Sequence, residues 1–205
     1  MTGVAESQLI LQRYLDEEAL TLILVRHGHK GGPPVEGLRG PSLLPQGHRQ
    51  AQCLARRFAS LPLDQIYCSD MARAYQTAEP IHALRPEVPF EVMPELREVA
   101  GQHLPGRPVG RTKEVRQRMA QERDAVGRFI QRLRHDHRPG QVVLAVVHGN
   151  LIRLLVPTLA GIPPRRSVPI STNNSSVTLL SLVEGKPPRI QLANCTRHLD
   201  VQDVD

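Results

Sequence analysis

Two histidines follow short apolar runs in this chain, and their surroundings suit chemistry on an anion. His27 stands between Arg26 and Gly28 directly after the run 22–25, and His148 follows a second such run. A neutral imidazole can attack phosphorus when its far nitrogen is held by a hydrogen bond, and a neighbouring guanidinium can grip phosphate oxygens. Gly28 permits close approach of the backbone. The pattern predicts a site that holds and attacks an anion, with phosphate as the first candidate.

Arg73 is a further candidate, because it falls in the first turn of a predicted helix behind a predicted strand at 65–68. Ser69 and Asp70 are expected to cap this helix. A helix N-terminus favours a bound anion. An arginine at this position is equally compatible with a solvated helix surface, so Arg73 alone does not define the site.

Alternating strand-like and helix-like segments have to position these residues. Apolar runs predict strands at 21–25, 65–68, 89–93, 142–147, 176–183 and 189–193. Apolar residues at helical spacing predict helices at 45–61, 71–84, 112–134 and 150–160. This alternation is typical of an α/β fold, so we expect a three-layer α/β/α sandwich with a mainly parallel, doubly wound central sheet.

Chain length, glycines and prolines set the expected domain organisation. A chain of 205 residues suits one sizeable core, so we expect an N-terminal lead-in at 1–20 and a single domain at 21–200. Between 99 and 112, five glycines and prolines predict a mobile, lid-like surface segment. The stretch 28–34 is expected to be a loop for the same reason.

Composition narrows the set of partners. A formal net charge of +6 fits an anionic ligand. Only 3% of the residues are aromatic and tryptophan is absent, which argues against nucleic-acid binding by stacking of bases on aromatic side chains. No apolar run approaches the roughly 20 residues of a membrane helix, and the first residues lack a secretory-signal pattern. We therefore expect a cytoplasmic protein with no nucleic-acid and no membrane partner.

The cysteines and a histidine pair give little support to metal or redox chemistry. Cys53, Cys68 and Cys195 are widely spaced without a C-x-x-C pair, so reduced thiols are expected. His135 and His137 stand near the end of a predicted helix, and no further ligand lies at a fixed spacing from them. We expect neither a metal nor another cofactor.

The motifs around these residues occur in an order that resembles a known family. From about Thr21 to His198, the chain is similar to the histidine phosphatase superfamily, which includes cofactor-dependent phosphoglycerate mutases and many small phosphomonoesterases. The motifs that carry the resemblance are Arg26-His27-Gly28, Leu44-Pro45-Gln46-Gly47-His48-Arg49-Gln50-Ala51, Ser69-x-x-x-Arg73-x-x-Gln76-Thr77-Ala78, Leu96-Arg97-Glu98 and His148-Gly149-x-x-x-Arg153. Segments 172–178 and 194–199 are also similar to closing segments of family members.

The resemblance implies a role for each matching residue. His27 would be the nucleophile and would become a phosphohistidine. Arg26, Arg73 and His148 would surround the phosphoryl oxygens, with Gly28 beside the phosphate. These groups supply the positioning and charge stabilisation that phosphoryl transfer chiefly requires.

Proton transfer to the leaving group needs an acid, and Leu96-Arg97-Glu98 matches the acid segment of the family. Glu98 is the expected general acid, and it would act as the base when water attacks the phosphohistidine. Glu95, three residues earlier, is its rival. Arg153 is expected to brace the site from one helical turn beyond Gly149.

The stretch behind the nucleophile departs from the family pattern. Many family members place an asparagine there that helps to hold phosphate, whereas this chain has His29-Lys30-Gly31-Gly32. His29 and Lys30 are candidates to take over that contact. Asn150, which follows the second histidine motif, is a further candidate for substrate contact.

The resemblance favours a metal-independent phosphomonoesterase that acts on a phosphorylated small molecule. A phosphoglycerate mutase-like phosphoryl transferase and a phosphoprotein phosphatase stay open, although segment 99–112 is short for the covering insertion of a mutase. A catalytically degenerate binding module is a third class, and the joint presence of the site residues argues against it. A metal hydrolase built on His27, His29 and His148 is disfavoured because no positioned Asp or Glu stands near them. The substrate and the oligomeric state, a dimer included, stay open.

Overall fold

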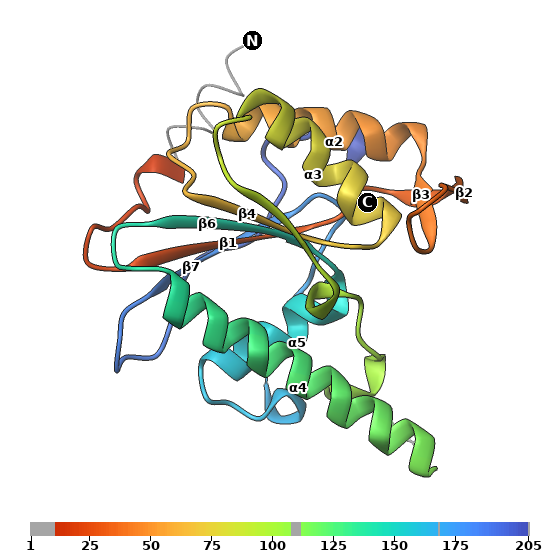
Figure 1. The fold of residues 1–205 in the computed structure, drawn as a ribbon, viewed down its shortest axis with the longest axis vertical. Coiled ribbons are helices and arrows are strands. Elements are labelled where there is room, and N and C mark those ends of the chain that lie inside the picture. The colour runs from red at the N-terminus through yellow and green to blue at the C-terminus, as the bar shows by residue number, and fades with distance from the viewer. Residues whose placement is uncertain (1–10, 108–111, 168, 205) are drawn as a thin grey trace.

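A six-stranded sheet runs through the middle of the molecule (Figure 1). The computed structural model describes residues 11–107, 112–167 and 169–204. In sheet order, the strands are β5 (Phe90–Met93), β4 (Gln65–Ser69), β6 (Val142–Val147), β1 (Leu20–Arg26), β7 (Val177–Leu182) and β8 (Arg189–Cys195). The first four are parallel, whereas β7 pairs antiparallel with both β1 and β8. The predicted α/β fold with a mainly parallel sheet is confirmed, with an antiparallel pair at one edge.

Helices cover both faces of the sheet (Figure 1). They are α2 (Pro45–Phe58) and α3 (Ala72–Leu84) on one face, and α4 (Lys113–Asp136) and α5 (Gly149–Leu159) on the other. Side chains of β1 alternate between the two apolar cores: Ile23 and Val25 pack with α2 and α3, and Leu22 and Leu24 pack with α4 and α5. A strand that is buried on both faces has no solvent-exposed face on which polar side chains would be favoured, which explains the uninterrupted apolar run before Arg26.

The expectation of a loop at 28–34 was wrong. Residues Lys30–Pro34 form strand β2, which pairs antiparallel with β3 (Pro41–Leu43) in a separate two-stranded sheet. The pairing is irregular and β2 is largely exposed. A short, irregular edge ribbon tolerates glycine and proline because few ladder hydrogen bonds are required of it.

The expectation that Ser69 and Asp70 cap helix α3 was also wrong. The helix begins at Ala72 with Met71 at the N-cap position, and no side chain caps it. Ser69 Oγ instead bonds to His148 Nε2, and the carboxylate of Asp70 pairs with the guanidinium of Arg97. Partners from distant parts of the chain have replaced the local cap.

The segment expected to be a lid is described only in part, because residues 108–111 lie outside the described residues. A short 3-10 helix, η2 (Gly101–His103), places His103 in a buried position against α4, where its Nε2 lies 2.7 Å from Glu122 Oε2. Part of the segment is thus packed rather than on the surface. Lid motion stays a prediction.

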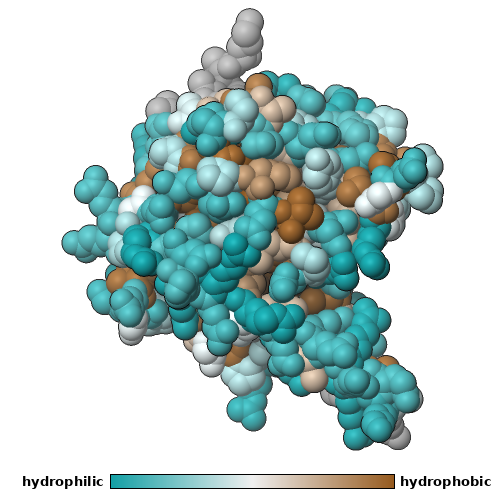
Figure 2. Space-filling model, in the orientation of Figure 1, coloured by the Kyte–Doolittle hydropathy of each residue, from teal (hydrophilic) through white to brown (hydrophobic). Residues whose placement is uncertain are grey.

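The N-terminal lead-in contributes to the core. Residues 1–10 lie outside the described residues, but Leu11 is fully buried among the side chains that α2 and α3 cover. Figure 2 shows a mainly hydrophilic surface on the face drawn, with apolar residues in small areas. Within residues 11–107, 112–167 and 169–204, no helix combines the length and apolar character needed to cross a membrane.

Candidate active site

Three parallel strands bring the candidate residues together at their carboxyl ends. Strand β6 lies between β4 and β1. Ser69 ends β4, His27 follows β1, and His148 follows β6. Ligands of open α/β sheets bind outside the carboxyl ends of the strands. The two histidine rings lie there with their centroids 5.1 Å apart, and both side chains are buried.

His27 is held as a neutral imidazole with a defined tautomer. Its Nδ1–H donates to the carbonyl oxygen of Gly28 at 2.8 Å. Burial lowers the pKa of His27 to about 3, and the charges of Arg73 and Arg26 act in the same direction. Because Nδ1 carries the proton, the lone pair is on Nε2. This is the form of imidazole that can act as a nucleophile.

The backbone that follows His27 is fixed by helices on one side of the sheet. Gly28 N–H donates to Thr77 Oγ1 of α3 at 3.0 Å, and His29 N–H donates to Gln50 Oε1 of α2 at 2.7 Å. A Cβ on Gly28 would lie 2.8 Å from the carbonyl oxygen of Gly47. Only glycine allows this close contact between the chain and α2.

His148 presents a buried donor toward the same space. Its Nε2 lies 2.9 Å from Ser69 Oγ, which also accepts a hydrogen bond from Met71 N–H. Burial holds the pKa of His148 well below its usual range, and His27 adds to the effect. A hydroxyl that donates to Nε2 leaves the proton on Nδ1, and this nitrogen has no hydrogen-bond partner among the described residues. Such unpaired buried groups are rare and suit a ligand.

Three cations surround the histidines. Arg26 Nη1 donates to the carbonyl oxygen of Thr172 at 2.5 Å. The buried Arg73 has an Nε with no hydrogen-bond partner in the described part of the chain. Burial and Arg73 lower the pKa of Lys30, and the charge of Lys30 in turn lowers the pKa of both His27 and His148. The site is therefore strongly positive, which favours an anionic ligand.

Glu98 is the carboxylate that shares this environment. Its Oε1 accepts from the backbone N–H groups of Val99, Asn150 and Leu151 at 3.2, 3.1 and 3.2 Å. Burial raises the pKa of Glu98 even though these hydrogen bonds and Arg73 oppose the shift. With Oε1 occupied by three donors, Oε2 is the oxygen available to carry a proton.

Glu95 lies in a different place. It belongs to the 3-10 helix η1 (Pro94–Leu96) and lies 3.8 Å from Arg128 Nε on α4. Arg97, between the two glutamates, points to Asp70 after β4, where Nε and Oδ1 are 2.8 Å apart. This pair fixes the segment that carries Glu98 against the start of α3.

The remaining predicted residues have the following positions. Asn150 makes its side-chain contacts within the protein: Nδ2 donates to Val99 O at 3.2 Å, and Oδ1 accepts from Arg153 Nη1 at 3.3 Å. His29 lies directly before β2, and its backbone N–H is held by Gln50.

The histidine pair near the end of α4 does not form a metal site. His137 bonds to Tyr67, and the exposed His135 bonds to Asp136. No group of three or more His, Cys, Asp or Glu side chains in the described ranges is arranged to hold a metal ion.

Several residues that support the site had no predicted role in it, and Ser69 was expected only to cap helix α3. Ser69, Thr77 and Gln50 stand inside the motifs, so their presence was visible although their contacts were not. Thr172 contributes a backbone carbonyl to Arg26 across 146 positions of sequence. The carbonyl of Asp203, in the 3-10 helix η4 (Val201–Asp203), accepts from Gln50 Nε2 at 2.6 Å. Backbone contacts of this kind leave no signal in residue types.

Known proteins share this fold and these motifs. The family model "Histidine phosphatase superfamily (branch 1)" matches residues 22–196. The chain therefore belongs to the histidine phosphatase superfamily. Its fold is that of the alpha-ribazole phosphatase of Shigella flexneri, with a TM-score of 0.65 and 23% identity over 88% of this chain and 98% of that chain.

Curated relatives include phosphatases and a mutase. The mitochondrial serine/threonine-protein phosphatase PGAM5 of Xenopus laevis is 29% identical over 190 residues, covering 87% of this chain and 66% of that protein. The "Probable phosphoglycerate mutase GpmB" of Yersinia enterocolitica is 28% identical over 211 residues, covering 91% of this chain and 98% of that protein. The chain spans about half to two-thirds of the length of several curated relatives that it matches.

Proposed function

We propose that this chain is a metal-independent phosphomonoesterase that hydrolyses a phosphorylated small molecule through a phosphohistidine on His27. The observation that carries the proposal is the state of His27: a neutral, buried imidazole with Nδ1 tied to its own backbone and positive groups around it. A cytoplasmic location, with no nucleic-acid or membrane partner, is part of the same proposal.

The reaction has two steps. In the first, Nε2 of His27 forms a bond to phosphorus, the P–O bond to the leaving group breaks, and protonated Glu98 gives its proton to the leaving oxygen. In the second, Glu98 accepts a proton from water as the water oxygen bonds to phosphorus. The N–P bond then breaks and inorganic phosphate leaves.

Charge stabilisation is the chief contribution of the surrounding groups. Arg26 and Arg73 offer guanidinium donors, Lys30 adds a third positive charge, and His148 offers its Nδ1–H to the phosphoryl oxygens. Since Arg26 and His148 are held by hydrogen bonds to the protein before any ligand binds, little reorganisation of these two groups accompanies the reaction.

The names of two relatives suggest two alternatives that use the same chemistry, one with a different substrate and one with a different acceptor. A phosphoprotein substrate is suggested by the frog protein's name, and phosphoryl transfer to a second acceptor by the name of the Yersinia protein. All three reactions use the same phosphohistidine. Release of inorganic phosphate from small monoesters separates hydrolysis from transfer, and a phosphopeptide panel tests the protein substrate. If the chain is a catalytically degenerate binding module, neither the small monoesters nor the phosphopeptides are turned over.

The direct test is hydrolysis of p-nitrophenyl phosphate by purified protein in the presence of a chelator. We expect turnover that the chelator does not change, loss of turnover to background in His27→Ala, and wild-type rates in the control His135→Ala, whose side chain is exposed on α4. Turnover that disappears with the chelator would favour a metal hydrolase, and undiminished turnover in His27→Ala would contradict the nucleophile.

A further inference from the structure

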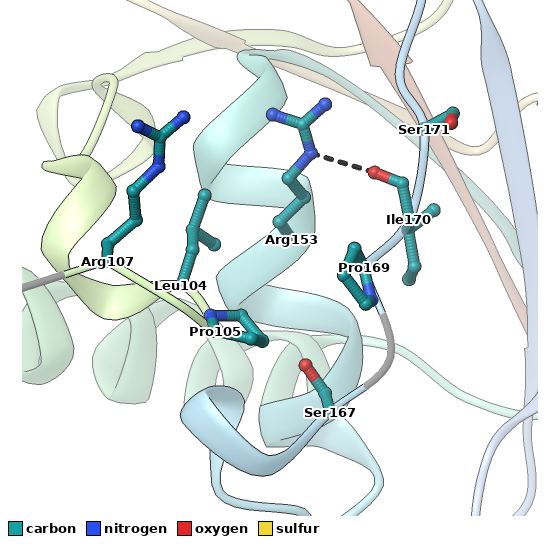
Figure 3. A pocket seen from close by; sticks show the side chains of 8 residues that line it. All are labelled: Leu104, Pro105, Arg107, Arg153, Ser167, Pro169, Ile170 and Ser171. Carbon is teal, nitrogen blue, oxygen red and sulfur yellow. Dashed lines mark hydrogen bonds between the residues drawn. The ribbon is translucent and has the colours of Figure 1, made fainter.

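Figure 3 shows a cavity of ≈ 280 Å³ that lies beside the proposed active site. Arg153 lines it and donates from Nη1 to Asn150 Oδ1 at 3.3 Å, and Asn150 N–H in turn donates to Glu98 Oε1 at 3.1 Å. A larger cavity, of ≈ 720 Å³, lies elsewhere in the molecule. The proposed reaction makes no use of this larger cavity, so its ligand has to be inferred from its own lining.

The larger cavity lies at the end of the central sheet that is opposite to the proposed active site. Leu20, the first residue of β1, lines it, together with residues at the C-terminal ends of α4 and α5 and in the turn at 183–188 between β7 and β8. His27 follows the other end of β1, whose 7 residues span roughly 20 Å at about 3.3 Å each. Figure 1 shows the turn between β7 and β8 at one end of the sheet and the ribbon of β2 and β3 at the other. A ligand in this cavity therefore does not touch the catalytic groups.

The most buried residues that line the larger cavity belong to the apolar core. Leu20 and Leu159 are only 6% and 8% exposed and lie in the core that α4 and α5 cover, and the partly buried Leu182 packs against the same core. These three leucines are called the apolar floor. The other apolar residues that line the cavity are Pro139, Ala160, Val183, Pro187 and Pro188. An apolar group that covers the floor gains binding free energy by removing this surface from water.

The exposed part of the lining is cationic. Arg134, Arg138 and Lys186, called the cationic rim, line the cavity, whereas Glu184 is the only acidic residue among the described residues that do so. In the described ranges, none of the three cations forms an ion pair. Nη1 of Arg138 donates to the carbonyl oxygen of His135 at 2.7 Å, which holds this guanidinium at the end of α4. Three cations against one carboxylate favour an anionic ligand.

Two neighbouring residues leave this charge balance as it is. His137 also lines the cavity, with its Nε2 3.0 Å from Tyr67 Oη, and burial lowers the pKa of His137, so the ring is neutral at pH 7. The carboxylate of Asp136 is already engaged by Arg132 and His135. The excess positive charge of the rim is therefore available to a ligand.

We infer that the larger cavity binds a small amphipathic carboxylate, with its apolar body on the apolar floor and its head group at the cationic rim. The volume of ≈ 720 Å³ lies in the range of about 300–1,000 Å³ that is usual for small-molecule sites. It corresponds to roughly 24 water molecules at about 30 Å³ each, which is room for a chain of about eight carbon atoms and its head group. Guanidinium groups bind carboxylates with paired hydrogen bonds. The inference does not depend on the proposed reaction.

Titration of ¹⁵N-labelled protein with octanoate, followed by NMR, locates the site and measures its affinity. Three reference compounds separate the body from the head: octanamide lacks the charge, octylammonium reverses it, and acetate lacks the body. We expect octanoate to shift the amide resonances of residues 138, 159–161 and 182–186 and to bind at least about tenfold more tightly than each reference compound. His27→Ala should bind octanoate as the wild type does, because the proposed active site takes no part.

Variants of the cationic rim test the position of the head group. In Arg134→Gln and in Lys186→Gln, the affinity for octanoate should fall at least about threefold, and in the double variant it should approach the affinity for octanamide. The affinity for octanamide should stay unchanged in all of them, which shows that the apolar floor is still folded. The matched control is Arg123→Gln, because Arg123 is exposed on the same helix as Arg134 and does not line the cavity.

Three results overturn the inference. The first is octanoate binding that is no tighter than that of octanamide or octylammonium, or that is absent up to about 10 mM. The second is a set of resonance shifts confined to residues near His27. The third is an octanoate affinity that the double variant leaves unchanged.

Discussion

Glu98 and Glu95 stand three residues apart but differ in what surrounds them. Glu98 is held by backbone N–H groups at the start of α5 and has a pKa raised by burial, whereas Glu95 lies beside Arg128 on α4. A carboxyl group with a raised pKa stays protonated at a higher pH and can give its proton to a leaving group. The difference between the two residues therefore comes from their environment.

Glu98→Gln tests the acid directly. Glutamine keeps an oxygen for the three backbone donors but has no proton to transfer, so kcat/KM for an alkyl phosphate, which covers the step up to loss of the leaving group, should fall by about 10²–10⁴-fold. For p-nitrophenyl phosphate kcat/KM should fall much less, because its leaving group departs without a proton, whereas kcat should fall for both substrates because Glu98 is also the base of the second step. Glu95→Gln is the matched control and should keep wild-type rates. Equal losses of kcat/KM for both substrates would contradict the assignment of Glu98 as the acid.

The pH profile gives a second test at this scale. His27 has a pKa of about 3, so the nucleophile is neutral above that pH. Glu98 has to be protonated in the first step, so kcat/KM should decrease as pH rises through its raised pKa. Measured from pH 4 to 9, the wild type should be most active on the acid side, and Glu98→Gln should lose this alkaline decrease. A wild-type profile that rises with pH would contradict the account.

At the level of elements, the backbone that follows His27 depends on helix α2 and the C-terminal helix η4. Gln50 accepts a hydrogen bond from His29 N–H and donates one to the carbonyl oxygen of Asp203. Arg49 Nη2 also lies 2.7 Å from Asp203 Oδ1. The fully buried Gln50 thus joins the segment after His27 to a segment 153 positions later.

Gln50→Ala should lower the free energy of unfolding by about 1–3 kcal/mol, because the partly buried N–H of His29 and the buried carbonyl of Asp203 lose their partner. It should also lower kcat, since the turn that carries His27 loses a support. Gln46→Ala on the same helix is the control: its hydrogen bond to Gln202 is 3.5 Å long and exposed, so less than about 0.5 kcal/mol is expected. Chemical denaturation and steady-state rates measure both effects. Equal stability of the two variants would show that Gln50 does not brace the turn.

The contrast between predicted and observed elements has physical causes. The order of strands and helices was predictable because β1 and β6 are buried on both faces and keep uninterrupted apolar runs. The pairing of His27 and His148 followed from the same runs, because both residues come directly after them. Strand β2 and the uncapped start of α3 were not predictable, because their partners, Ser42 on β3 and His148 after β6, come from other segments. The roles of Thr172 and Asp203 depend on backbone carbonyls, which any residue supplies.

At the scale of the whole molecule, burial of neutral histidines couples stability to pH. Burial lowers the pKa of His198 to about 3, and Arg57 beside it acts in the same direction. His27 and His148 are lowered as well. In the unfolded chain a histidine has a pKa of about 6.5. The unfolded state therefore binds more protons between about pH 6.5 and 3, so stability is greatest above that range and is lost as pH falls through it.

The acid dependence can be assigned to one residue with His198→Asn, which lies outside the proposed mechanism. Near pH 4–5 the slope of unfolding free energy against pH should decrease by about 1.4 kcal/mol per pH unit, the contribution of one proton. His48→Asn, at an exposed position of α2, should leave the slope as in the wild type. Denaturant titrations at several pH values supply the slopes. An unchanged slope in His198→Asn would contradict a buried neutral imidazole.

The central claim, that His27 carries the phosphoryl group, is tested most directly by trapping the intermediate. The wild type is mixed with a ³²P-labelled phosphomonoester, quenched in alkali within one turnover and digested. We predict labelled phosphate that is stable to alkali, labile to acid and located on the peptide containing His27, and no label in His27→Ala. Hydrolysis of the ester with no label on His27 at any quench time would contradict the account.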